Sequence, residues 1–256
     1  MTPGWVVNGP GDHPGAGHSV STYPGAMEQR PPVALVRRAR AVDRILQKTY
    51  PDAHCELDFR NPYELLVATI LSAQCTDQRV NQVTPALFAK YPDPAALAAA
   101  DRQELEEIIR PTGFFRNKAT SLQSMAATVC QKHAGQIPRP MSALVKLPGV
   151  GRKTAHVVRG NAFDQPGFTV DTHVQRLSHR LGWTQETDPV RIEYALDALF
   201  PRKDRTMVSH RLIFHGRRCC FARKPACAAC PVARLCPSRD IGEQDPVRAE
   251  QMIKRP

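Results

Sequence analysis

The chain has 256 residues, and its 35 Lys and Arg residues outnumber its 24 Asp and Glu residues, which gives a formal net charge of +11. A chain of this length can bury roughly 70–75% of its unfolded surface, enough for one large domain or two small ones. The positive charge favours a polyanionic partner, with a membrane surface as the alternative. The longest apolar run, 65–71, is far shorter than the ~18 residues of a spanning helix, and no secretion signal opens the chain. We therefore expect a cytoplasmic protein, nucleoid-associated if bacterial, that is neither secreted nor membrane-bound.

The first 32 residues differ in composition from the rest of the chain. They hold six of the 15 glycines and six of the 23 prolines, with few aliphatic residues, so residues 1–32 are expected to form a flexible segment. From Val33 to Pro51 apolar residues recur at helical spacing and predict a first helix. Asn61 and Pro62 then have the pattern of an N-cap and a first helical residue. The sequence that follows is apolar nearly all round and predicts a central, buried helix.

The same helix-start signals recur downstream. Asp93-Pro94 and Asp188-Pro189 are again cap-plus-proline pairs, and Asp101 followed by Glu104 resembles a capping box. Further helical patterns cover 76–90, 115–133, 172–181 and 204–215. Sustained period-two alternation is absent from the sequence, so the prediction is an all-α protein of roughly ten helices.

Residues 147–155 read Leu-Pro-Gly-Val-Gly-Arg-Lys-Thr-Ala and lie between two short helical patterns, which predicts a helix, a tight hairpin and a second helix. Gly149 and Gly151 permit close approach of another backbone, and the second helix would begin with free N–H groups suited to a phosphate. A Pro-Gly turn alone would indicate an ordinary helix turn. Four cations surround it, with no acid between positions 146 and 159: Lys146, Arg152, Lys153 and Arg159. This favours a grip on a nucleic-acid backbone.

The stretch 147–155 resembles the helix-hairpin-helix of the endonuclease III family of DNA glycosylases, including its lysine. The resemblance implies that Leu147, Gly149, Gly151 and Arg152 contact DNA.

Four cysteines within 17 residues have the spacing C-x6-C-x2-C-x5-C: Cys220, Cys227, Cys230 and Cys236. Thiols of an intracellular chain stay reduced, and four on one short segment can share a single metal centre. By ligand chemistry and spacing, structural zinc and a cubane iron–sulfur cluster fit equally. The spacing resembles the iron–sulfur loop of the same family, which implies a [4Fe–4S] cluster with Cys220, not the adjacent Cys219, as first ligand. The remaining cysteines are expected to be small buried thiols: Cys55, Cys75, Cys130 and Cys219.

Arg223 and Lys224 lie between the first two cluster ligands, in a region (201–224) with eight Lys or Arg residues and one acid. Such a charge run is usually just a solvated face. Because a cluster would shape a short loop around these cations, we expect a structural metal with a phosphate-contacting loop and no redox step in the base chemistry.

Lys153 is the candidate nucleophile. It falls at the second or third residue of the predicted helix, where the macrodipole and the adjacent Arg152 are expected to lower its pKa. A neutral amine can attack C1′ of a damaged nucleotide, displace the base and form a Schiff base that permits β-elimination. Asp171 precedes another helix, where its simplest role is an N-cap worth about 1 kcal/mol. The stretch 170–176, Val-Asp-Thr-His-Val-Gln-Arg, resembles the family's catalytic-aspartate motif, which implies that Asp171 supports the reaction.

A duplex hides C1′, so the target nucleotide must be flipped out and the gap filled. By resemblance, Gln74 matches the glutamine that occupies this space, and Phe114 stands where relatives often have an intercalating leucine. Core packing is the alternative for Phe114 and Phe115. Asp77 is expected to line the pocket.

The resemblance covers roughly 33–237 and implies two helical domains flanking a DNA-binding cleft. A six-helix domain, 55–165, would hold the hairpin, and 33–54 with 166–238 would form the cluster domain. Residues 239–256 are mixed in charge and are expected to form a tail.

The implied function is a bifunctional DNA glycosylase and abasic-site lyase of base excision repair. It would act as a monomer on duplex DNA that carries an oxidised pyrimidine or an abasic site. One alternative is the related adenine-mismatch glycosylase, which typically lacks the hairpin lysine and carries an extra C-terminal domain. The presence of Lys153 and the 20 or so residues after Cys236 make this alternative less favoured. The other is a noncatalytic helix-hairpin-helix DNA-binding protein, which would not explain the pair Lys153 and Asp171.

Overall fold

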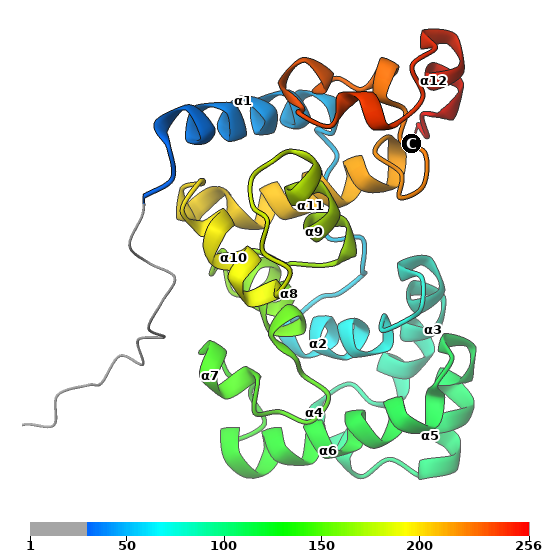
Figure 1. The fold of residues 1–256 in the computed structure, drawn as a ribbon. Helices are drawn as coiled ribbons and strands as arrows, with labels where there is room; N and C mark the ends of the chain where they lie inside the picture. The colour runs from blue at the N-terminus through cyan, green and yellow to red at the C-terminus, as the bar shows by residue number, and fades with distance from the viewer. Residues whose placement is uncertain (1–29, 256) are drawn as a thin grey trace, which may run out of the picture. The chain divides into compact units, whose positions relative to one another are not determined.

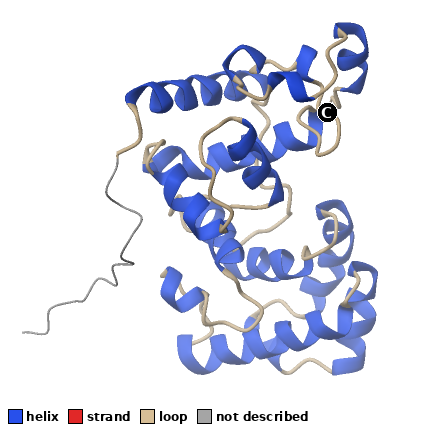
Figure 2. Cartoon of the chain, viewed as in Figure 1, coloured by secondary structure: helices blue, strands red, loops and turns tan. Residues whose placement is uncertain are grey.

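The computed structural model describes residues 30–255, and the chain from Pro31 onward forms a unit of its own. All but the last three residues of the predicted flexible segment lie outside the described residues. Every regular element of the described part is helical, which confirms the all-α prediction (Figures 1 and 2). The α-helices are α1 (Val33–Thr49), α2 (Pro62–Leu71), α3 (Asp77–Lys90), α4 (Pro94–Ala98), α5 (Arg102–Ile109), α6 (Phe115–His133), α7 (Met141–Leu144), α8 (Arg152–Ala162), α9 (Thr172–Arg180), α10 (Pro189–Asp197), α11 (Arg205–Arg218) and α12 (Pro246–Met252). Short 3-10 turns are η1 (Arg110–Thr112), η2 (Arg202–Asp204), η3 (Cys227–Ala229), η4 (Ala233–Leu235) and η5 (Arg239–Ile241).

Helix α2 is the centre of the first hydrophobic cluster. Asn61 caps it by accepting a hydrogen bond from the Glu64 N–H at 2.9 Å, and Pro62 is its first residue, as predicted. Every residue from Tyr63 to Leu71 is buried. Each buried Leu, Ile or Val side chain stabilises the fold by roughly 1.5–3 kcal/mol, so the continuous apolar surface of α2 explains its central place.

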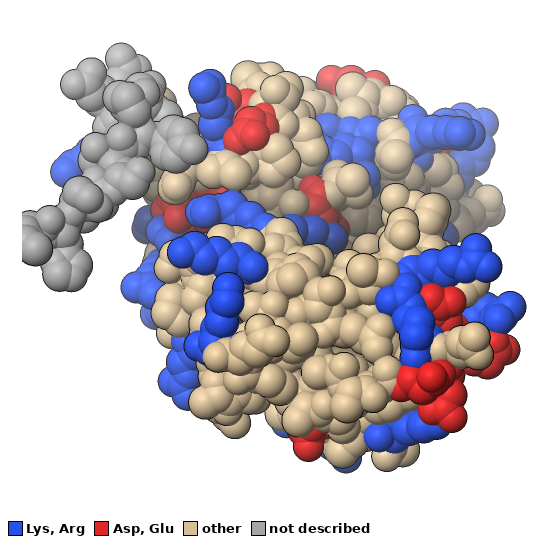
Figure 3. Space-filling model, turned by 90° about the horizontal axis from the view of Figure 1, so that it is seen from below, with Lys and Arg blue, Asp and Glu red and all other residues tan. Residues whose placement is uncertain are grey.

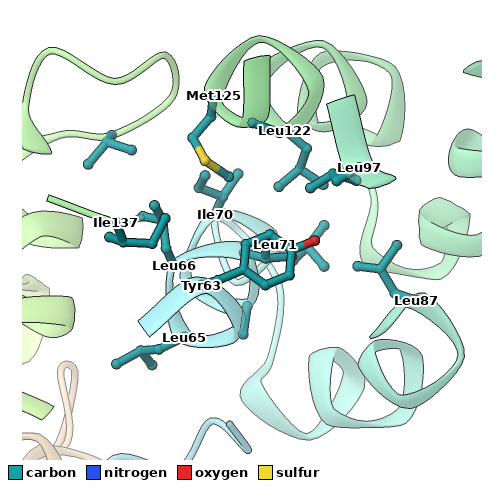
Figure 4. Packing of buried hydrophobic residues seen from close by; sticks show 14 of the residues in the cluster. Tyr63, Leu65, Leu66, Ile70, Leu71, Leu87, Leu97, Leu122, Met125 and Ile137 are labelled. Atoms are coloured by element: carbon teal, nitrogen blue, oxygen red, sulfur yellow. The ribbon is translucent and has the colours of Figure 1, made fainter. Parts of the chain in front are cut away.

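Helices α3, α6 and α8 pack on α2, and α5 packs on α3 and α6. Figure 4 shows side chains of α3, α4, α6 and the segment after α6 gathered around those of α2. The side chains labelled there are Leu87, Leu97, Leu122, Met125 and Ile137 from these segments, and Tyr63, Leu65, Leu66, Ile70 and Leu71 from α2. This cluster, which we call the α2 core, contains buried residues from Leu57 to Val158.

A second cluster, the α11 core, draws its buried residues from two separate stretches, 39–53 and 168–232. Helix α1 packs against α11, and the Asp43 carboxylate accepts two hydrogen bonds from the Arg211 guanidinium at 2.8 and 3.0 Å. The N-terminal helix is thus held among elements more than 100 residues away in the sequence. The proposed division into domains 55–165 and 33–54 with 166–238 stays a prediction.

Residues 239–256 were expected to form a tail, but they include the helix α12. Asp245 caps it by accepting a hydrogen bond from the Arg248 N–H at 2.9 Å, and Pro246 is its first residue. Ala249 is fully buried against Cys219 and Ala226. The cap-plus-proline signal that marks the starts of α2, α4 and α10 is therefore present here too, and α12 lies against the loop that follows α11 (Figure 1).

Two surface properties bear on the partner. None of the helices in the described part is both long and apolar enough to cross a membrane. On the face seen from below, Lys and Arg side chains gather along the margins and a wide central area carries no charge (Figure 3). The centre of that face therefore offers no ionic contact to a phosphate.

Candidate active site and cluster loop

The hairpin between α7 and α8 is shaped by one glycine. Gly149 has φ +75°, and a Cβ there would lie 2.8 Å from the Cβ of Ser121 on α6, so a larger residue would be both strained and overlapped. The side chains of Leu147 and Val150 are buried in the α2 core. Leu147 can therefore reach DNA only through its backbone. Gly151 is the N-cap of α8, and no side chain caps this helix start, which suits an external phosphate.

The fold brings Lys153 and Asp171 to one cavity. Lys153 is the second residue of α8 and is exposed, and Asp171 lies at the start of α9. Both line a cavity between α2, α8 and α11, together with Ser72, Asp77, Thr169 and His210. A lysine amine and a carboxylate that are 18 positions apart in the sequence thus share one concave site.

Asp171 is an N-cap, as its simplest interpretation predicted. Its Oδ1 accepts a hydrogen bond from the Val174 N–H at 2.8 Å. No ion pair of the described residues involves its carboxylate. The side chain therefore serves the helix with one oxygen and presents negative charge to the cavity.

The other two acids of the cavity are paired with one cation. Arg217 of α11 forms an ion pair with Glu56 and another with Asp77, the latter at 3.1 Å. Burial raises the pKa of Asp77, and the nearby positive charge of Lys153 partly opposes this rise. Sequence patterns gave no indication of Arg217, because its partners lie 140 and 161 positions away.

A histidine on the cavity wall is held neutral. Burial lowers the pKa of His210 to about 4, and its Nε2 lies 2.9 Å from the Oδ1 of Asn161. At neutral pH the ring therefore adds no positive charge beside Lys153. It was not among the residues singled out in the sequence.

Arg152 is held by an acid that the sequence analysis missed. Its Nε and Nη2 donate hydrogen bonds to the Glu193 carboxylate at 2.6 and 2.8 Å, and His156 Nε2 lies 2.9 Å from the same carboxylate. Glu193 is buried on α10. Because this bidentate pair engages the guanidinium, an Arg152 side-chain contact to DNA would compete with it.

Gln74 and Phe114 share an unusual backbone conformation. Gln74 has φ +54° and Phe114 has φ +48°, in the left-handed region that costs a non-glycine residue about 1–3 kcal/mol. Gln74 is exposed, and Phe114 is 64% exposed. Core packing was the alternative for both phenylalanines, and it applies only to Phe115. This side chain packs against the α2 core between the Arg110 and Arg116 guanidiniums.

The four predicted cluster ligands converge. Cys220, Cys227, Cys230 and Cys236 line one cavity beside α9 and α11. Arg180 Nη1 donates to the Cys220 sulfur at 3.3 Å, and His215 Nε2 lies 3.5 Å from the Cys230 sulfur. Cys219 lines the same cavity as a fifth thiol. The four predicted ligands, with a guanidinium nitrogen beside one sulfur and an imidazole nitrogen beside another, fit a four-thiolate cluster.

The other thiols differ in burial. Cys219 is buried, and its sulfur lies within 4.8 Å of the Cys230 sulfur and a His215 ring nitrogen. Cys55, Cys75 and Cys130 are only half-buried, less than the sequence analysis expected.

The two cations of the cluster loop are not equivalent. Both Arg223 and Lys224 are exposed. Lys224 Nζ lies 2.6 Å from the carboxylate of Glu243, whereas no ion pair of the described residues involves Arg223. Arg223 is therefore the more available of the two for a phosphate.

Comparison with known proteins agrees with this fold and site. Residues 67–202 match the HhH-GPD superfamily of base excision DNA repair proteins, and residues 220–236 match the iron–sulfur binding domain of endonuclease III. The fold and its hairpin thus define the class as a helix-hairpin-helix base excision repair protein, and the second match confirms the predicted iron–sulfur cofactor.

Individual relatives narrow the class. The chain is 56% identical over 203 residues to endonuclease III of Synechocystis sp., and this match covers 79% of this chain and 93% of the relative. It is 47% identical over 188 residues to endonuclease III of Bacillus subtilis, and that match covers 73% of this chain and 86% of the relative. A solved endonuclease III in non-covalent complex with DNA superposes with a TM-score of 0.76 at 45% identity, over 80% of this chain and 96% of that one. The chain belongs to the endonuclease III family and is a DNA glycosylase with abasic-site lyase activity.

Proposed function

We propose that Lys153 is the nucleophile of this enzyme and that Asp171 is the carboxylate that supports it. The observation that carries the proposal is their shared cavity, in which Arg217 pairs with the other two acids, Glu56 and Asp77. Asp171 is left as the acid of this cavity without a cationic partner among the described residues. It can therefore stabilise positive charge on the sugar or accept a proton.

The chemistry follows from the amine. The Lys153 nitrogen forms a bond to C1′ of the damaged nucleotide while the C1′–N bond to the base breaks, and the base leaves with the bonding pair. Loss of a proton from nitrogen and opening of the sugar give a Schiff base, which makes the C2′ hydrogens acidic. Removal of one of them expels the 3′ phosphate by β-elimination and cuts the strand. A relative trapped as a covalent endonuclease III–DNA intermediate supports this route.

The proposed substrate is duplex DNA with an oxidised pyrimidine or an abasic site, bound by a monomer in the cytoplasm. The uncapped start of α8 would bind the backbone phosphate, with Gly149 and Gly151 allowing its approach. Arg223 would bind a second phosphate. The exposed side chains of Gln74 and Phe114 would fill the space left by the flipped nucleotide.

Borohydride trapping on a duplex with one abasic site tests the nucleophile. The parent protein should form a covalent adduct, and Lys153→Ala should form none because no other amine replaces the missing one. Lys146→Ala is the matched control, since Lys146 is an exposed lysine seven positions earlier on the hairpin. A full yield of adduct from Lys153→Ala would refute the assignment.

Asp171→Asn separates catalysis from helix capping. Asparagine caps a helix about as well as aspartate, so the thermal midpoint should hold within a few degrees. Turnover should fall by ~10²-fold or more, a usual loss for a general base or a charge-stabilising group. Unchanged turnover would leave Asp171 with the capping role alone.

A further inference from the structure

Lys118 is a buried lysine without an acidic partner. Its side chain lies on α6 and the residue is 6% exposed. Its ammonium donates hydrogen bonds to the carbonyl oxygens of Leu71, at 2.7 Å, and Thr112, at 2.8 Å. None of the ion pairs in the described part of the chain involves it. A buried cation that only carbonyls solvate is costly, and an apolar residue would fill the volume more cheaply.

The two carbonyls belong to the loops that carry Gln74 and Phe114, two of the four non-glycine residues with positive φ in the described part of the chain. Leu71 ends α2 three positions before Gln74, and Thr112 ends η1 two positions before Phe114. The backbone N–H of Lys118 also donates to the Phe114 carbonyl at 3.1 Å. One residue therefore bonds to both loops, 47 and 6 positions away, through its side chain, and to Phe114 through its backbone.

Strained residues persist only where neighbouring structure holds them in place. The Gln74 loop has few other bonds. Cys75 N–H donates to the Ser72 carbonyl at 3.1 Å, Ala73 N–H donates to the Ile70 carbonyl at 3.4 Å, and the Ser72 N–H and hydroxyl donate to the Ala68 and Thr69 carbonyls, both at 2.9 Å. These bonds stay within the loop or end on α2, and none of them connects the loop to the Phe114 loop. The ammonium of Lys118 supplies that connection.

We infer that Lys118 is a positioning residue that holds the Gln74 and Phe114 loops in register, so that both side chains enter the duplex together. The inference rests on the proposed roles of Gln74 and Phe114. A merely structural lysine would stabilise the fold without affecting one substrate more than another. Replacement of a positioning lysine should lower the reaction rate most on a substrate in which a base has to be unstacked.

The test compares full-length, cluster-loaded Lys118→Met with Lys132→Met, a control that removes an exposed lysine from the same helix. Two duplexes are used, one with a paired oxidised pyrimidine and one with an abasic site in an unpaired bulge. Single-turnover base excision by Lys118→Met should fall about tenfold or more, with borohydride trapping on the bulge unchanged within about twofold, because the bulge needs no unstacking. Equal losses on both substrates, or no loss on either, would overturn the inference.

A mutant cycle adds a second readout. If Lys118 acts through the two loops, adding Lys118→Met to the double variant Gln74→Ala, Phe114→Ala should lower the excision rate little further. If the effects are independent, the fold losses in rate would multiply. Lys118→Gln, which can still donate to one carbonyl, replaces Lys118→Met if the latter fails to fold. Absence of any adduct from the parent protein would refute the proposed role of Lys153 as nucleophile. That outcome differs from an active parent whose rates Lys118→Met matches on both duplexes, which would overturn only the inference about Lys118.

Discussion

The hairpin and the cluster loop both present cations to the solvent, but different forces hold them. The hairpin is held by apolar burial: Leu147 and Val150 are at most 6% exposed within the α2 core, and Gly149 packs closely on Ser121. The cluster loop buries fewer apolar side chains: Val232 lies in the α11 core, and Cys219, Ala226 and Ala249 of α12 form a separate cluster of three buried residues. Apolar burial can therefore hold the hairpin, whereas the cluster loop, which buries fewer apolar side chains, depends also on metal ligation.

Each region pairs one of its cations with an acid. In the hairpin the guanidinium of Arg152 is bonded to the buried Glu193, whereas in the cluster loop Lys224 is paired with Glu243 and Arg223 has no such partner. Each region thus uses one cation to fasten its loop to a neighbouring helix or segment. Only Arg223 of these three is left without an acidic partner among the described residues.

Removal of iron should show the difference between the hairpin and the cluster loop most clearly. Chelation of the cluster should abolish its absorbance at about 400 nm and expose amides of residues 220–236 to hydrogen exchange. Amides of residues 147–158 should keep their protection, because apolar burial holds the hairpin. Equal loss of protection in both regions would show that the hairpin, too, depends on the metal.

Leu147→Ala should have the opposite effect. Truncation of this buried side chain should lower the free energy of unfolding by about 2–5 kcal/mol while the cluster absorbance per iron stays unchanged. Val145→Ala, at a position 40% exposed two residues earlier, should change it by no more than about 0.5 kcal/mol. Denaturant unfolding followed by circular dichroism measures both. A small effect of Leu147→Ala would mean that the hairpin is not held by burial.

Ala249→Glu tests what α12 adds to the cluster loop. A carboxylate forced into a fully buried position should detach α12 and cost roughly 1–3 kcal/mol, with faster loss of cluster absorbance on exposure to a chelator. Val247→Glu places the same charge on a residue of α12 that is 68% exposed, and it should behave like the parent. Identical rates of cluster loss in both variants would show that α12 does not protect the loop.

Arg223→Gln should have the smallest effect, seen in DNA binding alone. Loss of one phosphate contact should weaken binding nearly uniformly across sequences and reduce the slope of log K against log salt by about 1. Lys224→Gln should change the slope less, because Glu243 already neutralises that ammonium. Fluorescence anisotropy at several salt concentrations distinguishes the two variants, and an unchanged slope for Arg223→Gln would exclude the contact.

Much of the fold could be predicted because its signals are local. Asn61-Pro62 and Asp188-Pro189 start helices where the cap-plus-proline pattern places them, and the predicted bounds 115–133 match those of α6. A cap bonds within three residues of itself, so the neighbouring sequence contains the whole interaction. The start of α12 carries the same signal at Asp245-Pro246 and could have been recognised in the same way.

The sequence by itself determined the helical class, the hairpin and the cysteine spacing, and its resemblance to the family made Lys153 and Asp171 the candidates for catalysis. Only the tertiary structure decided which charges are available, because ion pairs such as Arg152 with Glu193 and Arg217 with Asp77 join residues 41 and 140 positions apart. The same holds for Lys118, a lysine unremarkable in sequence until α6 brings it to the carbonyls of two loops. Local patterns specify helices, but the neighbours of a side chain are set by packing between helices distant in the chain.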